Sequence, residues 1–225
     1  SDVCSSDLSC RFNYLIRLTP SVSTTPIPIN GRTMKIVLAS GNQKKLKELS
    51  AVLPADWQLA DQASMGVAEP EETGLTFIEN ALIKARNAAA TTGLPALADD
   101  SGLCVDALDG APGIYSSRFS GLDATDASNN RLLLEKMTGI SDRAAHFFCC
   151  IVFLRHAEDP EPLIAHGRWH GSILTAPQGD NGFGYDPLFW LADYQCSSAE
   201  LTPARKNQIS HRGMALQQFQ SMLTS

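Results

Sequence analysis

Two adjacent carboxylates, Asp99 and Asp100, follow a short apolar run in the segment ALADDSGL. Like charges side by side repel each other, so a fold that holds them together usually has a cation to bind or a proton to transfer there. Ser101 and Gly102 come next, and Asp, Ser and Gly are also common in ordinary turns. The residues alone leave two interpretations open, a metal-holding corner between two short strands and a plain acidic turn.

The segment SGNQKK, which begins at Ser40, joins a predicted strand to a predicted helix. Ser40, Gly41 and Asn42 would present a hydroxyl, backbone N–H groups and the positive helix end to one point, and Lys45 would lean back toward it. This arrangement predicts a phosphate cradle, although a simple capped helix with a solvated lysine pair explains the same residues. The segment does not match the P-loop pattern GxxxxGK[ST], so a P-loop nucleotide-binding protein is disfavoured.

Two acidic residues stand before a second predicted helix in EETGLTFIENALIKAR. Glu71 and Glu72 could merely complement the helix dipole. If Glu72 meets Asp100 in space, the two carboxylates, together with substrate phosphates and water, are the ligands that Mg²⁺ prefers. Lys84 on the same helix could then reach the phosphates, or stay solvated as most helix lysines do.

Two further motifs lie near the C-terminus, GFGYDP and KNQISHRG. In the first, Phe183 and Tyr185 could offer an aromatic face to a base, and Asp186 could accept a hydrogen bond from its ring N–H. A tight turn with core aromatics explains the same residues. The second motif supplies donors that suit a phosphate or a base carbonyl. These donors are Lys206, His211 and Arg212.

The elements that must position these groups predict one mixed α/β domain over residues 34–225. Strands are expected at 34–39, as a pair around the Asp-Asp corner within 97–108, at 144–154 and at 163–174. Helices are expected after 42, over 76–91, over 126–137 and from 203 toward the C-terminus. Residues 109–121, rich in Gly and Ser, are expected to form a loop.

Composition narrows the class of protein. The 225 residues are 44% hydrophobic and 19% charged, with a formal net charge of -6, which argues against nucleic acid as the main partner. No segment reaches the roughly 20 apolar residues that span a bilayer. The six cysteines form no CxxC pair and are expected to be reduced. We therefore expect a cytoplasmic protein with no nucleic-acid and no membrane partner.

Residues 1–33 differ from the rest, because they lack an initiator Met and show no helical or strand periodicity. Codons for SDVCSSDL can match the tail of a common sequencing adapter. We therefore expect an artefactual or disordered extension, with Met34 as the first native residue. A targeting peptide is less well supported, since Asp2 and Asp7 stand where a basic segment is expected.

Six segments together carry a family resemblance in their order and spacing. They are SGNQKK, EETGLTFIENALIKAR, LADDSGL, GAPGIYSSRFSG, GFGYDP and KNQISHRG. The chain from Met34 to about Leu223 resembles the inosine triphosphate pyrophosphatase family, the Ham1-like enzymes also called XTP/dITP diphosphatases or noncanonical purine NTP pyrophosphatases. It departs from the pattern at TPAR, residues 202–205, where the family is usually more acidic.

The resemblance implies an elongated, two-lobed α/β fold around a long mixed sheet, usually as a homodimer. It implies Mg²⁺-dependent hydrolysis of ITP, dITP and XTP to the nucleoside monophosphate and pyrophosphate. Asp100 would be the proton acceptor and a metal ligand, Glu72 the second metal carboxylate, and Asp99 a close support and additional candidate ligand. The triphosphate would contact Ser40, Gly41, Asn42, Lys45, Lys84 and Ser101, and the nucleoside would contact Phe183, Gly184, Tyr185, Asp186, Lys206, His211 and Arg212.

Two alternatives stay open. One is a Maf-type nucleotide pyrophosphatase that acts on other modified bases, which a panel of modified triphosphates would separate. The other is a catalytically silent nucleotide-binding regulatory dimer, for which loss of Asp100 or Lys45 would be expected. Both residues are present.

Overall fold

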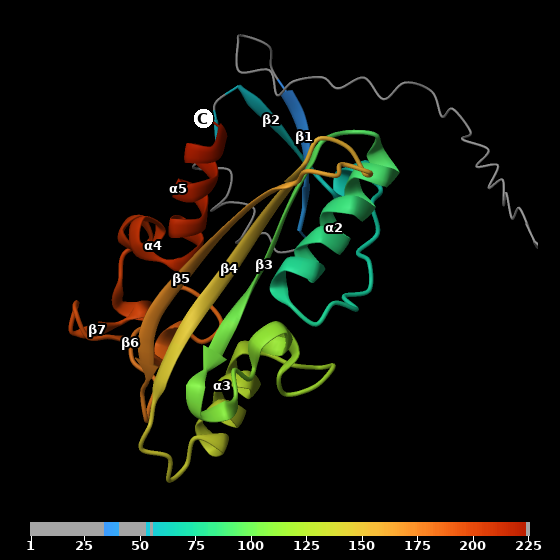
Figure 1. Ribbon diagram of the computed structural model, residues 1–225. Helices are drawn as coiled ribbons and strands as arrows, with labels where there is room; N and C mark the ends of the chain where they lie inside the picture. The colour runs from blue at the N-terminus through green and yellow to red at the C-terminus, as the bar shows by residue number, and fades with distance from the viewer. Residues whose placement is uncertain (1–33, 41–52, 55, 224–225) are drawn as a thin grey trace, which may run out of the picture.

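The computed structural model describes residues 34–40, 53–54 and 56–223 (Figure 1). Within these residues the chain forms one seven-stranded sheet in the order β2-β1-β3-β4-β5-β6-β7. The strands are β1 (Met34–Ala39), β2 (Trp57–Asp61), β3 (Ala96–Val105), β4 (Ala144–Leu154), β5 (Leu163–Ile173), β6 (Phe189–Leu191) and β7 (Cys196–Ser197). Both neighbours of β1 run parallel to it and the other pairs are antiparallel, so the sheet is mixed.

Helices connect and cover these strands. The α-helices are α2 (Phe77–Thr92), α3 (Asp126–Lys136), α4 (Pro203–Ile209) and α5 (His211–Leu223). Short 3-10 helices are η1 (Ala63–Met65), η2 (Asp106–Leu108), η3 (Gly113–Arg118), η4 (Asp186–Leu188) and η5 (Ser198–Glu200). Among the described residues, no helix is long and apolar enough to span a bilayer.

Two helices cover opposite faces of the sheet. On one face, α2 buries Ala81, Ala85 and Ala88, whose small side chains let the helix lie close to β1 and β3. On the other face, α5 buries Leu216 and Phe219 in a separate core with the opposite side chains of the same strands. Because successive side chains of a strand point to opposite faces, neighbouring residues of β3 face different helices.

A third core lies at the far end of the long strands. It contains Leu133 of α3 together with Phe147, Trp169 and Phe189 from three strands. Strands β3, β4 and β5 run from the α2 and α5 end to the α3 end, which makes the molecule elongated (Figure 1). The expectation of an elongated α/β fold around a long mixed sheet is confirmed.

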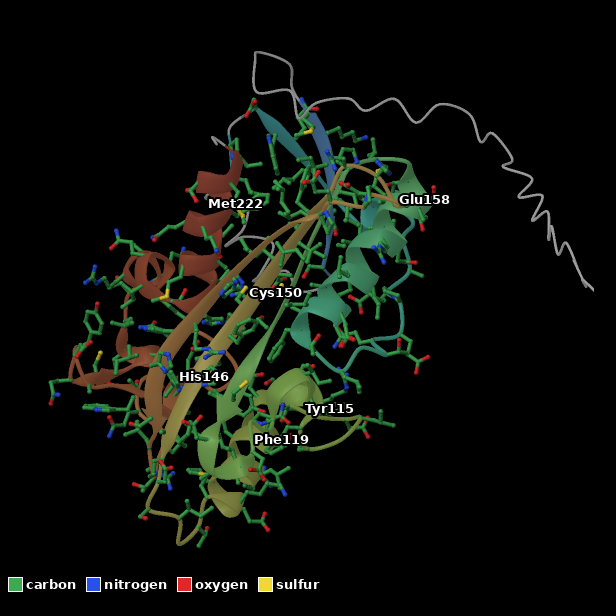
Figure 2. All side chains as sticks on the ribbon, in the orientation of Figure 1. Tyr115, Phe119, His146, Cys150, Glu158 and Met222 are labelled. Carbon is green, nitrogen blue, oxygen red and sulfur yellow. The ribbon has the colours of Figure 1, made fainter. Side chains whose placement is uncertain are left out.

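The predicted corner at Asp99 and Asp100 is wrong, because β3 runs without a break through both residues. In the antiparallel ladder Asp99 pairs with Ile151 and Asp100 pairs with Cys150. Figure 2 labels Cys150 midway along β4, and this marks the level of the two carboxylates. Cross-strand pairing with β4 overrides the local turn tendency of Asp, Ser and Gly.

Local signals in the sequence located α2 well. The Thr76 hydroxyl caps the helix by accepting a hydrogen bond from the backbone N–H of Glu79, and Gly93 ends it at a φ of 68°. The predicted loop at 109–121 contains η3, which has no apolar periodicity to reveal it. The predicted helix after residue 42 and the extension 1–33 lie outside the described residues.

A sharp elbow at Ser210 separates α4 from α5. The Ser210 backbone N–H donates to the carbonyl of Lys206, and the Ser210 hydroxyl accepts from the Gly213 N–H at 3.2 Å. A Cβ on Gly213 would overlap the Asn207 carbonyl, so only glycine permits this close approach. The elbow holds both ends of KNQISHRG against each other.

Candidate active site

A cleft of about 720 Å³ lies where β3, α2, η3, α4 and α5 meet. This volume falls within the range of small-molecule binding sites. The described residues that line it include nearly all the predicted site residues. They are Ser40, Glu72, Lys84, Asp99, Asp100, Ser101, Phe183, Gly184, Tyr185, Asp186, Lys206, His211 and Arg212. Gly41, Asn42 and Lys45 lie outside the described residues.

Glu72 and Asp100 converge on one cationic atom. The Lys84 Nζ lies 2.8 Å from Asp100 Oδ1 and 3.0 Å from Glu72 Oε1. Arg118 Nη1 lies 3.0 Å from the other oxygen, Glu72 Oε2. Since both carboxylates reach the same nitrogen atom, they are close enough to hold one cation between them.

Charge pairing sets the protonation states of Lys84 and Glu72. Burial by itself lowers the pKa of Lys84, but the charges of Asp100, Asp99 and Glu72 outweigh it and hold that pKa above its usual value. Burial raises the pKa of Glu72, but Lys84 and Arg118 more than compensate, so the net pKa is lowered. Near neutral pH Glu72 is therefore ionised and Lys84 is protonated.

The donor set fits a hard divalent cation. Two carboxylates that converge on one point, with room in the cleft for phosphate oxygens and water, match the coordination habits of Mg²⁺. Among the described residues, no group of three or more His, Cys, Asp or Glu side chains is arranged to hold a metal ion. Substrate and water would therefore have to complete the coordination shell.

Asp99 lies on the opposite face of β3 from Asp100. Its Oδ2 is 3.4 Å from Arg212 Nη2 at the start of α5, and the same nitrogen donates to Ser101 Oγ at 3.1 Å. The side chains of Asp99 and Arg212 are 0% and 4% exposed. Its contacts therefore place Asp99 beside Arg212, and give no support to its prediction as an additional metal ligand.

The segment Phe183–Asp186 is held by groups from several elements. The Gly184 N–H donates to Asp126 Oδ2 at 2.8 Å, and Asn130 Nδ2 of α3 donates to the Gly184 carbonyl at 2.9 Å. The Tyr185 hydroxyl donates to the Ser116 carbonyl of η3 at 2.8 Å. Tyr185 is buried, so its ring is a core side chain and its hydroxyl joins this segment to η3.

Asp186 holds this segment together through several protein partners. Its oxygens accept hydrogen bonds from the Phe183 N–H at 2.8 Å and from Ser198 Oγ at 2.9 Å. Lys206 Nζ lies 2.5 Å from Asp186 Oδ2 and 4.8 Å from the centre of the Phe183 ring. Asp186 is only 2% exposed but lines the cleft, so its hydrogen bond to a base stays a prediction. Phe183, which is half-buried, remains the aromatic face of the segment.

His211 and Cys150 flank the site on opposite faces. The His211 ring stacks on Phe147, with centroids 4.8 Å apart, and this fixes its plane at the cleft wall. Burial, aided by the charges of Asp100 and Asp99, raises the pKa of the Cys150 thiol to about 12. At neutral pH the thiol keeps its proton, so Cys150 is not a nucleophile.

Sequence reasoning missed Arg118 and the residues that hold η3. The Asn129 side chain accepts from the Ser120 N–H at 2.8 Å and donates to the carbonyl of Ser117 at 3.1 Å. A Cβ on Gly102 would overlap the Gly113 carbonyl, so glycine lets η3 approach β3 closely. The motif GAPGIYSSRFSG contains Arg118 and pointed to this region. Its residues show no helical or strand periodicity, so the sequence did not indicate which way the Arg118 side chain points.

Comparisons with known proteins agree with this geometry. A sequence model described as the Ham1 family matches residues 36–222. The chain is 56% identical over 188 residues to a dITP/XTP pyrophosphatase of Vibrio cholerae, which covers 82% of this chain and 94% of that protein. It is 57% identical over 189 residues to a dITP/XTP pyrophosphatase of Photobacterium profundum, with 82% and 95% covered.

A solved structure gives the same result. A HAM1 protein from Coxiella burnetii superposes with a TM-score of 0.82 at 50% identity, covering 85% of this chain and 98% of that one. Sequence and structure therefore match over almost the whole of the described region. The chain belongs to the Ham1 family.

Proposed function

We propose that this chain hydrolyses noncanonical purine nucleoside triphosphates, namely ITP, dITP and XTP, to the nucleoside monophosphate and pyrophosphate with the aid of Mg²⁺. The observation that carries the proposal is the convergence of Glu72 and Asp100 on one cationic atom in the cleft. The dITP/XTP pyrophosphatase relatives supply the substrate class.

Charge placement supports the phosphate end of the site. A bound Mg²⁺ would polarise phosphate oxygens and favour deprotonation of water. Lys84 and Arg118 would balance the negative charge that develops on the phosphoryl oxygens. Asp100 would accept the proton of the attacking water, because its carboxylate faces the cleft from the rigid middle of β3. Attack at the α-phosphorus would release pyrophosphate.

Donor placement supports the base end of the site. Arg212, His211 and Lys206 line the cleft, and Asp99 orients Arg212. Hypoxanthine and xanthine carry a carbonyl at position 6, where adenine carries an amino group. A buried donor facing that carbonyl would lose its partner with adenine, which costs about 1–3 kcal/mol. Asp99 therefore acts on base selection through Arg212 and not on the metal.

A panel of nucleoside triphosphates with separate detection of pyrophosphate and phosphate tests the function. We expect ITP, dITP and XTP to have kcat/KM values at least roughly 10- to 100-fold above those of ATP, with pyrophosphate as product. Release of single phosphates with IDP as product would contradict attack at the α-phosphorus. Preference for modified pyrimidines would favour a Maf-type activity, and binding without turnover would favour a regulatory role.

The proposal includes a homodimer acting in the cytoplasm. Leu75, Tyr115 and Leu122 are large apolar side chains with 83%, 54% and 99% of their surface exposed. Figure 2 labels Tyr115 at the α3 end of the molecule, and this residue also lines the cleft. A partner subunit could cover such side chains, and sedimentation equilibrium would test the assembly.

A further inference from the structure

Two cationic side chains contact three of the four carboxylate oxygens of Glu72 and Asp100. Lys84 contacts one oxygen of Asp100 and one of Glu72, and Arg118 contacts the second oxygen of Glu72. Both oxygens of Glu72 therefore already accept charged hydrogen bonds from the protein. The four side chains carry two negative and two positive charges, so together they are neutral.

A divalent cation and these two side chains compete for the same oxygens. Mg²⁺ binds carboxylate oxygens at about 2.0–2.1 Å, so it cannot share the space that the Lys84 ammonium fills between the two carboxylates. The ammonium and guanidinium would also repel a nearby divalent cation. Metal binding to Glu72 and Asp100 therefore requires Lys84 to leave its present position.

Lys84 and Arg118 have longer and more adaptable side chains than Asp100, which is held in a strand. Asp100 sits in the middle of β3, paired with Cys150, and its side chain is 9% exposed. Lys84 has a flexible four-carbon stem, and the Arg118 side chain is 35% exposed toward the cleft. A triphosphate in the cleft would offer both of them oxygens of higher negative charge than the carboxylates do.

We propose that Lys84 and Arg118 form a charge lock, which keeps a divalent cation off Glu72 and Asp100 until a triphosphate draws the two side chains away. Metal and triphosphate then bind with positive coupling, and each strengthens the binding of the other by the same factor. The triphosphate half of this proposal rests on the proposed function. The lock itself concerns only the cations and carboxylates described above.

Binding of Mn²⁺ alone, followed by electron paramagnetic resonance in the absence of nucleotide, tests the lock. We expect weak binding to the wild-type protein and binding at least about fivefold tighter to Lys84→Met, since allosteric couplings typically span about 5- to 150-fold. Arg118→Met should give a smaller gain of the same sign. Arg86→Met is the matched control, because Arg86 is an exposed cation on the same helix and should change Mn²⁺ affinity less than about twofold.

Two outcomes would overturn the lock. One is that Lys84→Met binds Mn²⁺ no more tightly than the wild type, and the other is that Arg86→Met gains as much as Lys84→Met, which would indicate general charge. Circular dichroism checks folding, and Lys84→Gln replaces Lys84→Met if the latter does not fold. A lock that fails while the triphosphate panel succeeds leaves the proposed function intact. Tighter Mn²⁺ binding with a failed panel would support the lock and remove the function.

A second measurement tests the coupling. Affinity for a nonhydrolysable ITP analogue is measured by calorimetry with and without Mn²⁺. In the wild type we expect Mn²⁺ to tighten analogue binding at least about fivefold, and in Lys84→Met this factor should fall. An unchanged factor in Lys84→Met would contradict the coupling between the two ligands.

Discussion

The two faces of β3 use the same residue type in opposite ways. On the α2 face, Asp100 lines the cleft and shares the Lys84 ammonium with Glu72. On the α5 face, Asp99 is 0% exposed and contacts Arg212 and Ser101. One carboxylate is thus available to a ligand, while its neighbour orients a donor. The strand pleat, and not the residue type, assigns the task.

The difference follows from what packs on each face. The small alanines of α2 leave the acidic residues around Glu72 and the lysine on the helix facing an open cleft. On the other side, α5 packs tightly on the sheet, because a Cβ on Gly167 would overlap the His211 carbonyl. We therefore expect a ligand to rearrange charges on the first face and to leave the second face unchanged.

The largest expected effect distinguishes Asp100 from every other carboxylate of the site. Asp100→Asn keeps the shape of the side chain but removes the proton acceptor and a charged ligand oxygen. We expect kcat with ITP to fall by about 10³-fold or more, with the fold retained. Pyrophosphate release with circular dichroism measures both quantities. Asp123→Asn, a matched change of an exposed carboxylate, should be neutral, and activity of Asp100→Asn within tenfold of wild type would remove Asp100 from this role.

The next effect concerns stability on the α5 face. Asp99→Asn leaves the guanidinium of Arg212 buried without its counter-charge, which should lower the free energy of unfolding by about 3 kcal/mol. Affinity for Mn²⁺ should stay within about twofold of wild type, since Asp99 contacts Arg212 and Ser101 on the other face of β3. Urea unfolding and Mn²⁺ titration measure the two properties.

A double-mutant cycle sharpens this comparison. If the ion pair carries the effect, Asp99→Asn combined with Arg212→Met should cost less than the two single changes added together. Additive costs would show that the pair is not coupled. A large loss of Mn²⁺ affinity in Asp99→Asn would return Asp99 to the metal site.

The smallest expected effect tests the hydrogen bond that joins the segment Phe183–Asp186 to η3. Tyr185→Phe removes the hydroxyl that donates to the Ser116 carbonyl. A buried hydrogen bond of this kind contributes about 1 kcal/mol, so we expect KM for ITP to rise roughly fivefold with kcat nearly unchanged. Steady-state kinetics measure the split. The control Tyr194→Phe changes a partly exposed tyrosine, and an equal effect there would mean that the link is unimportant.

Much of the fold could be predicted from local pattern. The caps of α2 and the apolar runs of β4 and β5 located these elements to within one or two residues. The Asp-Asp corner failed, since the turn tendency of its residues is local while pairing with β4 comes from 50 residues away along the chain. The local residues of the Asp-Asp motif carry no information about which strand they will pair with.

The sequence predicted which residues belong to the site better than it predicted what each residue does there. The motifs predicted most of the residues that line one cleft. The role of Asp186 depends on Ser198 and Lys206, which approach it only through η5 and α4. Arg118 lies in a short 3-10 helix whose orientation is set by Asn129, so its ion pair to Glu72 had no signal in the sequence.

The elbow at Ser210 has a consequence for the range of nucleotides that fit. Lys206 stands before the elbow and His211 and Arg212 follow it, and the contact between Gly213 and the Asn207 carbonyl leaves no slack between them. We therefore expect the backbone that carries the three donors to keep its geometry when a ligand binds. If these donors contact the base as proposed, we expect shape as well as hydrogen-bond pattern to exclude enlarged purines.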